Sequence, residues 1–304
     1  MSDAVMTQSA TQHTGAGGSP GGPAPARPVH RWTAGNVAAV VVLALLAAVW
    51  LLPFAWAVLT SVKPETDAAS SPISILPEHG FTLDSYRTIL AEGQVPVWAW
   101  NSLFTSAVIT FITVMSSALA AYAFSRIAFR GKKIVFMAAM LALAVPPQVL
   151  IVPLFYEMLA MNLVDTYWGL ILPQVVQPMI LLILKQFFDQ VPIELEDAAR
   201  VDGARRMRVF WSIVLPLSRP ILAAVSIFVF IWAWNNFLWP FIVINDPTLM
   251  TLPVGLQTVI SAYGIQYAQN MAMAILGALP LIVVFLFFQR QIIKGIATTG
   301  FGGK

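Results

Sequence analysis

Long apolar stretches recur along the chain and are separated by shorter polar segments. The first stretch, Val37 to Leu59, contains no charged residue. At 1.5 Å per residue it is long enough to cross a hydrocarbon core of about 30 Å, and it is too long for a cleaved signal peptide. Five more apolar stretches follow at Leu103 to Phe124, Ile134 to Leu154, Tyr167 to Phe188, Ile221 to Ile244 and Met271 to Phe288. The pattern predicts an all-α, polytopic membrane protein with six transmembrane helices.

The composition excludes a soluble globular enzyme. Of the 304 residues, 58% are hydrophobic and only 10% are charged, whereas soluble domains carry about a quarter charged residues. The net charge of +3 does not indicate nucleic-acid binding, because the basic residues lie beside apolar stretches. The chain contains no cysteine, which excludes disulfides and thiolate chemistry.

The basic residues predict the orientation in the membrane. Of the 17 Lys and Arg residues, all except Lys63 and Arg87 fall in segments on one side of the six predicted spans. The positive-inside rule then places both termini in the cytoplasm.

Three regions are expected along the chain. Residues 1–36 are rich in Gly, Pro, Ser and Thr and are predicted to be a disordered cytoplasmic tail. Residues 37–294 are expected to form the six-helix transmembrane domain, which includes a long inner segment at 190–220. Residues 295–304 are expected to be a cytoplasmic C-terminal tail.

The predicted spans carry amides and hydroxyls in place of titratable groups. No Asp, Glu, Lys, Arg or His lies in the core of a predicted span, so a proton-coupled carrier or a voltage sensor is not expected. Amides suit a neutral solute, although they also form hydrogen bonds between helices. The candidate contacts along a solute path are Gln148, Asn235, Asn236 and Trp239. Prolines at 53, 146–147, 173, 178 and 240 are expected to kink four spans.

The chain lacks the motifs of an energy source or a catalyst. Gly295 and Gly300 have phosphate-loop spacing, but Phe301 follows where Lys would be needed. The three histidines are scattered through exposed segments. We therefore expect no enzyme activity and no cofactor or metal bound by this chain, and any uphill transport must be driven by a partner.

The inner segment at 190–220 has a pattern typical of a docking helix. Pro192 suits a helix start, while Glu194, Glu196 and Asp197 place negative charge in the first turn. Arg205, Arg206 and Arg208 would complement the other end, and Gly203 is expected to turn the chain between two short helices. The face with Leu195, Ala198, Ala199 and Asp202 is nearly smooth, which favours contact with a protein over contact with lipid.

This segment resembles a known family. The sequence Asp197-Ala198-Ala199, then Gly203, then Ile213-Val214-Leu215-Pro216 is similar to the EAA loop of permease subunits of bacterial ATP-binding cassette (ABC) importers, with Asp197 where the family usually has Glu. Trp234 to Pro240, Thr251 to Leu256, and Gln289-Arg290 through Lys304 resemble the sugar-importer branch, in particular its smaller six-helix maltose-type subunit.

The resemblance implies a MetI-like fold in the inner (plasma) membrane of a bacterial cell. It also implies a second permease subunit, two ABC ATPase subunits that bind the ATP and Mg, and an extracytoplasmic sugar-binding protein. It implies that the EAA loop forms a helix seated on the ATPase, through Glu194, Glu196, Asp197, Ala198, Ala199, Asp202, Gly203, Ala204 and Arg205. The C-terminal tail would also reach the ATPase, with Gly295, Gly300 and Lys304 as candidate contacts. The expected solute is a di- or oligosaccharide such as trehalose or maltose. A channel or facilitator that works alone, and a membrane scaffold or enzyme subunit, remain as alternatives.

Overall fold

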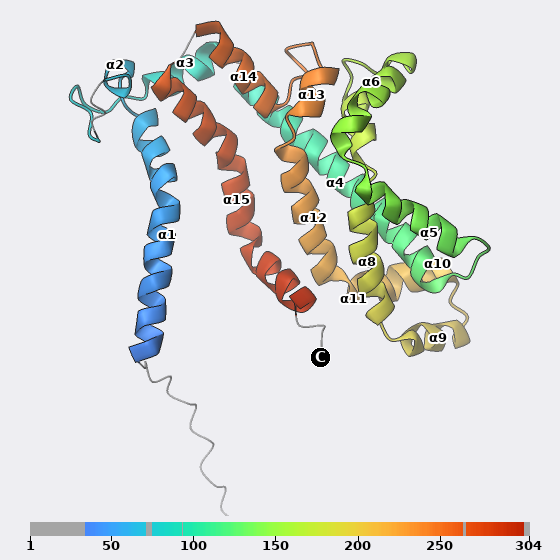
Figure 1. Cartoon of the computed structure of the whole chain (residues 1–304). Coiled ribbons are helices and arrows are strands. Elements are labelled where there is room, and N and C mark those ends of the chain that lie inside the picture. The colour runs from blue at the N-terminus through green and yellow to red at the C-terminus, as the bar shows by residue number, and fades with distance from the viewer. Residues whose placement is uncertain (1–33, 71–74, 93, 264–265, 301–304) are drawn as a thin grey trace, which may run out of the picture. The chain divides into compact units, whose positions relative to one another are not determined.

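A computed structural model describes residues 34–70, 75–92, 94–263 and 266–300. Within these ranges every regular element is a helix, which confirms the predicted all-α class (Figure 1). The chain divides into two units, residues 1–51 and 52–304, and the contacts described below all lie within the second unit.

The helices follow one another with short connections. Their bounds are α1 Ala34–Ser61, α2 Glu65–Ala68, α3 Asp84–Glu92, α4 Val95–Arg126, α5 Lys132–Leu141, η1 Ala142–Ala144, η2 Pro147–Leu150, α6 Ile151–Ala160, α7 Tyr167–Ile171, η3 Leu172–Gln174, α8 Pro178–Gln190, α9 Ile193–Val201, α10 Arg206–Val209, η4 Phe210–Val214, α11 Leu215–Leu217, α12 Arg219–Trp234, α13 Leu238–Val243, α14 Leu252–Tyr263 and α15 Tyr267–Gly300.

The described helices account for up to six membrane spans. Three are long and apolar enough to cross a bilayer unaided, at Gly35–Ser61, Val95–Arg126 and Tyr267–Phe287. Three bent pairs also qualify if each pair is one span: Lys132–Ala144 with Pro147–Ala160, Tyr167–Gln174 with Pro178–Gln190, and Arg206–Leu217 with Arg219–Trp234. The first two pairs correspond to predicted spans. Of the third pair, only Arg219–Trp234 overlaps a predicted span, because Arg206–Leu217 lies in the predicted inner segment at 190–220.

The prolines act less uniformly than the sequence suggested. The chain bends by 97° at Pro146–Pro147 and by 50° before Pro178, as expected. Helix α1, however, continues through Pro53. The predicted continuous span from Ile221 to Ile244 is wrong, because α12 ends at Trp234 and α13 begins at Leu238.

Proline still explains the break between α12 and α13. The ring of Pro240 would clash with the carbonyl four residues earlier, that of Asn236, if the helix ran on. A new helix that begins at Leu238 places Pro240 in its first turn, where no intrahelical donor is required. The helix therefore breaks one turn before the proline.

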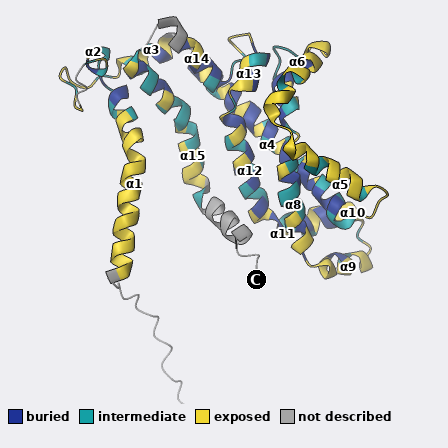
Figure 2. Cartoon of the chain, in the orientation of Figure 1, coloured by how far each residue is buried: buried dark blue, intermediate teal, exposed yellow. Residues whose placement is uncertain are grey.

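Helix α4 forms the centre of the second unit and packs against α8 and α12. One of its faces carries buried small residues, most of them three, four or seven positions from another: Ser102, Thr105, Ser106, Thr113, Ser117, Ala118 and Ala121. Small side chains let helix backbones approach closely in a membrane. Figure 2 shows buried positions along α4, α8 and α12, whereas the residues of α5 are exposed or intermediate.

Three outer segments join the predicted spans on the side away from most of the basic residues, at about 61–98, 161–166 and 245–270. They contact one another. The Trp98 indole Nε1 donates to the Pro247 carbonyl at 2.8 Å. The Glu65 carboxylate accepts hydrogen bonds from the backbone N–H groups of Tyr267 and Ala268, at the start of α15. These contacts join the first and third outer segments at one end of the bundle. Asp165, described below, joins the short second outer segment to the third.

Candidate coupling site

Helix α9 and the turn after it have the predicted form. The helix begins directly after Pro192 and ends at Val201. Gly203 has a φ of +83°, and the next N–H, that of Ala204, bonds back to the Ala199 carbonyl at 2.9 Å. A glycine in this left-handed conformation is a common way to end a helix. The prediction that Gly203 separates two short helices is confirmed, since α10 begins at Arg206.

The small-residue face of α9 is mostly uncovered by this chain. Leu195, Ala198 and Asp202 are exposed, and Val201 is 87% exposed. Ala199, which the sequence grouped with them, is half-buried and packs against the core. Helix α9 therefore presents one side to the bundle and leaves an open side whose residues are small, apolar or acidic.

Glu196 is the acid that faces inward. Its side chain is 0% exposed, and Oε1 lies 2.6 Å from Nε of Arg126, the last residue of α4. An isolated buried carboxylate is costly, and a paired one is tolerated when further hydrogen bonds satisfy both groups. The ion pair therefore holds α9 against the end of α4, and Glu196 is not an exposed docking residue.

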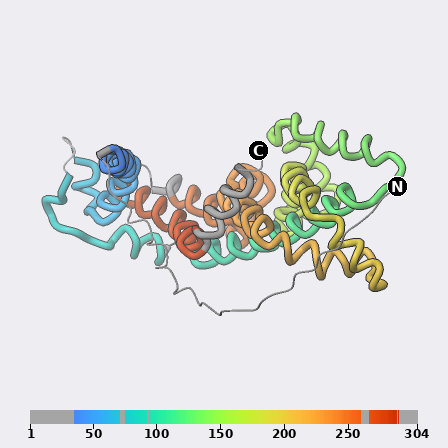
Figure 3. The backbone as a smooth tube through the Cα atoms, turned by 90° about the horizontal axis from the view of Figure 1, so that it is seen from below, coloured from blue at the N-terminus to red at the C-terminus, as the bar shows by residue number. Residues whose placement is uncertain are grey.

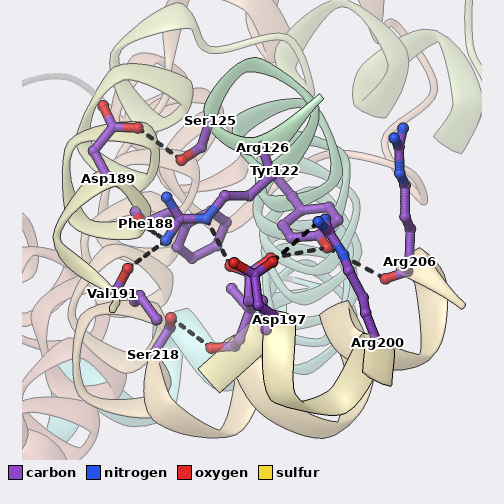
Figure 4. Close-up of polar contacts among 12 residues, drawn as sticks. Tyr122, Ser125, Arg126, Phe188, Asp189, Val191, Asp197, Arg200, Arg206 and Ser218 are labelled. Carbon is purple, nitrogen blue, oxygen red and sulfur yellow. Dashed lines mark hydrogen bonds and ion pairs between the residues drawn. The ribbon is translucent and has the colours of Figure 1, made fainter. Parts of the chain in front are cut away.

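Arg126 also bonds to the end of α8. Its Nη2 donates to the backbone carbonyls of Phe188, at 2.7 Å, and of Val191 (Figure 4). The last carbonyls of a helix have no intrahelical partner, so an arginine at this position satisfies them. One guanidinium thus joins α4, the end of α8 and α9.

A second set of polar contacts lies beside Arg126. The Ser125 hydroxyl donates to Asp189 Oδ1 at 2.7 Å, and Lys185 Nζ lies 2.6 Å from Asp189 Oδ2. The Tyr122 hydroxyl lies 3.4 Å from both Glu196 Oε2 and the Arg206 carbonyl. Ser125 therefore adds a second link from the end of α4 to the end of α8, and Tyr122 links α4 to α9 and α10 (Figure 4).

The remaining charged residues of the loop lie at the surface. Asp197, the acid of the EAA-like motif, is exposed and approaches only Arg200, at 3.4 Å, among the ion pairs of the described chain. The expectation that Arg205, Arg206 and Arg208 complement the end of α9 is wrong. Because the chain turns at Gly203, Arg205 caps α10 and the other two lie within it, which leaves Arg200 as the basic residue in the last turn of α9.

The other predicted ATPase contacts are only partly described. Glu194 is exposed in the first turn of α9. Gly295 and Gly300 lie in α15, which continues as a helix to Gly300. Lys304 lies outside the described residues, as do residues 1–33 of the predicted N-terminal tail.

The candidates for a solute path do not converge on one site. Asn236 Nδ2 donates to Gln174 Oε1 at 2.6 Å, and Trp239 Nε1 donates to the Gly169 carbonyl at 3.2 Å. Asn235 bonds within its own helix, to the Ile231 carbonyl, and Gln148 is exposed on η2. Asn236 and Trp239 therefore join α12–α13 to α7–η3, which is the interhelical alternative considered for such residues.

At the opposite end of the bundle, Asp165 joins the outer loops. It has a φ of +57°, and its Oδ1 accepts hydrogen bonds from the backbone N–H groups of Asn245 and Asp246. Burial alone would raise the pKa of this carboxyl, yet the N–H groups of Asp246 and Asn245 hold the pKa below its usual value. The short loop after α6 is thereby fixed to the segment after α13.

Arg126 and Asp165 were not predicted as site residues. The one available signal for Arg126 was its position as a charged residue at the end of an apolar span, opposite an inner segment with an extra acid beside the EAA-like motif. No local signal marks the partners of Asp165, which lie 80 and 81 residues further along the chain.

The geometry defines a class of protein: a membrane-embedded helical bundle with broken spans, in which one short helix is held at an end of the bundle with an open face. Comparison with known proteins identifies the family. Residues 113–297 match the family described as binding-protein-dependent transport system inner membrane component, and the chain belongs to it.

Curated relatives agree with this assignment. The arabinooligosaccharides transport system permease protein AraQ of Halalkalibacterium halodurans is 34% identical, over 86% of this chain and 94% of the relative. The trehalose/maltose transport system permease protein MalG of Thermococcus litoralis is 33% identical, over 86% and 94%. These relatives confirm the resemblance to permease subunits of the carbohydrate-importer branch.

A solved structure has the same fold. A chain from the crystal structure of a bacterial ABC transporter involved in the import of the acidic polysaccharide alginate aligns with a TM-score of 0.74, at 19% identity, over 84% of this chain and 95% of that chain. The predicted permease fold is therefore confirmed.

Proposed function

We propose that this protein is the permease subunit that couples ATP hydrolysis to sugar uptake, with α9 as the helix that docks on an ATPase. The observation that carries the proposal is that α9 has one exposed face and, on its other side, a buried ion pair that holds it to α4. Ala198, Val201 and Asp202 are exposed, while Glu196 on the other side is fully buried against Arg126. A helix that only lay on lipid would not need this ion pair.

The proposed assembly contains a second, homologous permease, two ABC ATPase subunits and an extracytoplasmic sugar-binding protein. The family is binding-protein-dependent by description, and a structure of the alginate importer includes a periplasmic protein bound to an alginate pentasaccharide. In this assembly ATP and Mg are held by the ATPases. Both termini and α9 face the cytoplasm, as the distribution of Lys and Arg predicts.

The proposed solute is a di- or oligosaccharide. The named relatives carry arabinooligosaccharides in one case and trehalose or maltose in another, so the relatives support a class of solute and not one sugar. Trehalose and maltose stay within this class. Asn236 and Trp239 are already engaged between helices, which supports a solute path lined in large part by the partner permease.

The proposal is tested on the open face of α9. Ala198→Glu adds a charged side chain to an exposed position and should leave the fold intact. We expect the variant permease to reach the membrane but to associate poorly with the ATPases. The sugar-loaded binding protein should then no longer stimulate ATP hydrolysis. Ala128→Glu is the matched control, since Ala128 is also exposed and lies on the same predicted side.

Two results would contradict the proposal. One is stimulation of ATP hydrolysis in the Ala198→Glu importer equal to that of the Ala128→Glu control. The other is sugar flux into liposomes that contain only this polypeptide, since a channel or facilitator needs no partners.

A further inference from the structure

We propose that Arg126 is a positioning residue that makes α9, the end of α8 and the end of α4 move as one rigid unit. The inference rests on the proposed function, because it concerns how a displacement of α9 by the ATPase reaches the membrane helices. Without a rigid joint, α9 would tilt on its own and the spans would stay in place.

The geometry of Arg126 is that of a joint and not of a surface ion pair. Its guanidinium uses Nε for Glu196 and Nη2 for the carbonyls of Phe188 and Val191. These acceptors come from α9, the end of α8 and the connection between them. Arginine suits this role, because its planar group presents several donors in fixed directions.

Burial distinguishes this pair from the others nearby. The side chains of Arg126 and Glu196 are 10% and 0% exposed, whereas those of Lys185 and Asp189 are 22% and 43% exposed. Exposed pairs are weak, and a buried pair is costly to break because the remaining partner is left without compensation. Loss of one member of the buried pair should therefore loosen α9 strongly.

The second short helix is attached to α4 as well. Tyr122, one turn before Arg126, lies within reach of the Arg206 carbonyl at the start of α10. The ring of Phe210, which is fully buried, packs on the Tyr122 ring with centroids 5.1 Å apart. Both sides of the Gly203 turn are thus fixed to the last turn of α4. Figures 1 and 3 show the course of the backbone in this part of the chain.

The ion pair spans a long stretch of sequence, and among the described residues no other ion pair joins α9 to α4. Positions 126 and 196 are 70 residues apart. The pair therefore connects two elements that the chain itself links only through α5 to α8. A change at Arg126 can alter the joint while the open face of α9 stays as it is.

The first experiment measures the joint without any partner. Because the chain has no cysteine, spin labels can be placed at Val201→Cys on α9 and Ala128→Cys after α4, both exposed positions. The full chain in lipid nanodiscs should give a narrow distance distribution. Glu196→Gln keeps the shape of the side chain but removes its charge, and we expect a broadened distribution; Lys185→Gln, which breaks the exposed pair, should stay narrow.

The second experiment measures coupling in the reconstituted importer. In Glu196→Gln and Arg126→Gln we expect basal ATP hydrolysis to persist, while sugar transported per ATP hydrolysed falls about tenfold to a hundredfold, the range expected for loss of a hydrogen bond to a charged group. Arg126→Lys keeps the charge but cannot replace the planar fork, so it should not restore coupling.

The outcomes are distinct. Two results would contradict the proposed joint. One is a distance distribution in Glu196→Gln that is as narrow as in the wild type. The other is an unchanged ratio of sugar transported to ATP hydrolysed, with both activities falling together. If Arg126→Gln fails to fold, Glu196→Gln alone decides the question. If the wild-type importer shows no ATP-driven uptake, the proposed function fails, while the spin-label result still decides whether the joint exists.

Discussion

Asn236 donates its side-chain amide to Gln174 Oε1 at 2.6 Å, although 62 residues separate them. Each residue lies at a helix break: Gln174 ends η3 before the 50° bend to α8, and Asn236 lies between α12 and α13. Gln174 Nε2 also donates to the Leu170 carbonyl. The two broken spans therefore meet at their breaks through one interhelical hydrogen bond.

We expect this hydrogen bond to stabilise the contact between the two broken spans. Gln174→Leu leaves the Asn236 amide without its acceptor and should lower the free energy of unfolding by about 1 kcal/mol. In a double-mutant cycle with Asn236→Leu, measured by thermal unfolding of the purified importer, the coupling energy should be about 0.5–1 kcal/mol. Asn235→Leu is the control, since Asn235 bonds within its own helix. Strict additivity of the two substitutions would contradict the prediction.

Gly255 is expected to tolerate no side chain. A Cβ at this position would lie 2.1 Å from the Trp98 ring, whereas a Cβ at Gly277 would meet only Leu256 Cδ1, at 3.5 Å. Gly255→Ala should displace Trp98, weaken its bond to the Pro247 carbonyl and cost about 1–3 kcal/mol. Gly277→Ala in the interior of α15 should be neutral or stabilising by about 0.5–1 kcal/mol. Equal thermal stability of the two variants would show that α14 is less closely packed on α4 than the structure indicates.

Local pattern predicted a large part of the fold. The apolar stretches located the candidate spans, and the acidic start of α9 and the glycine after it predicted a short helix and a turn at Gly203. Each of these features depends on residues within one continuous stretch of the chain, so the sequence contains what is needed. The resemblance of the loop around Asp197 added the family.

Contacts between distant segments could not be predicted from the sequence. Glu196 and Asp197 are adjacent acids, and only the packing of α9 on α4 shows that Glu196 is buried while Asp197 is exposed. The same holds for Asn236, whose amide could have faced a solute or a helix. Helix α14 lies between two predicted spans and was not predicted, because Pro253 and Gly255 interrupt its apolar pattern.

Substitutions of Gly203 should be limited by the backbone conformation at this position and not by steric contact with neighbouring atoms. Gly203 has a φ of +83° and no neighbouring atom within 4 Å of a Cβ. Gly203→Ala should therefore cost about 1–2 kcal/mol through the left-handed conformation alone, and Gly203→Asn less. We expect stimulated ATP hydrolysis to be highest with Gly at position 203, lower in Gly203→Asn and lowest in Gly203→Ala.

Gly80 provides the matched control for the Gly203 variants. It has the same φ of +83° and is equally open, but it lies in the first outer segment. Gly80→Ala should lower stability by a similar amount and leave the stimulation of each folded importer unchanged. Equal loss of stimulation in both alanine variants would mean that the effect is one of general stability.

The outer segment after α1 should be held most firmly in mildly acidic solution. His79 Nδ1 lies 2.6 Å from Asp67 Oδ1, and the backbone N–H groups of Glu78 and His79 donate to Asp67 Oδ2. The hydrogen bond to Asp67 raises the pKa of His79 above 6.5. The hydrogen bond from the backbone N–H of His79 is the largest cause that lowers the pKa of Asp67 below 3.8, and the hydrogen bond with the His79 side chain is the next largest.

The sign of the pH dependence follows from these two shifts. The contribution of His79 is complete below pH 6.5 and is lost as the pH rises through its raised pKa. The contribution of Asp67 is complete above pH 3.8 and is lost as the pH falls through its lowered pKa. Hydrogen exchange at the Glu78 and His79 amides, corrected for the intrinsic rate, should show declining protection above neutral pH. His79→Gln should abolish that decline, and an unchanged decline in this variant would assign it to another group.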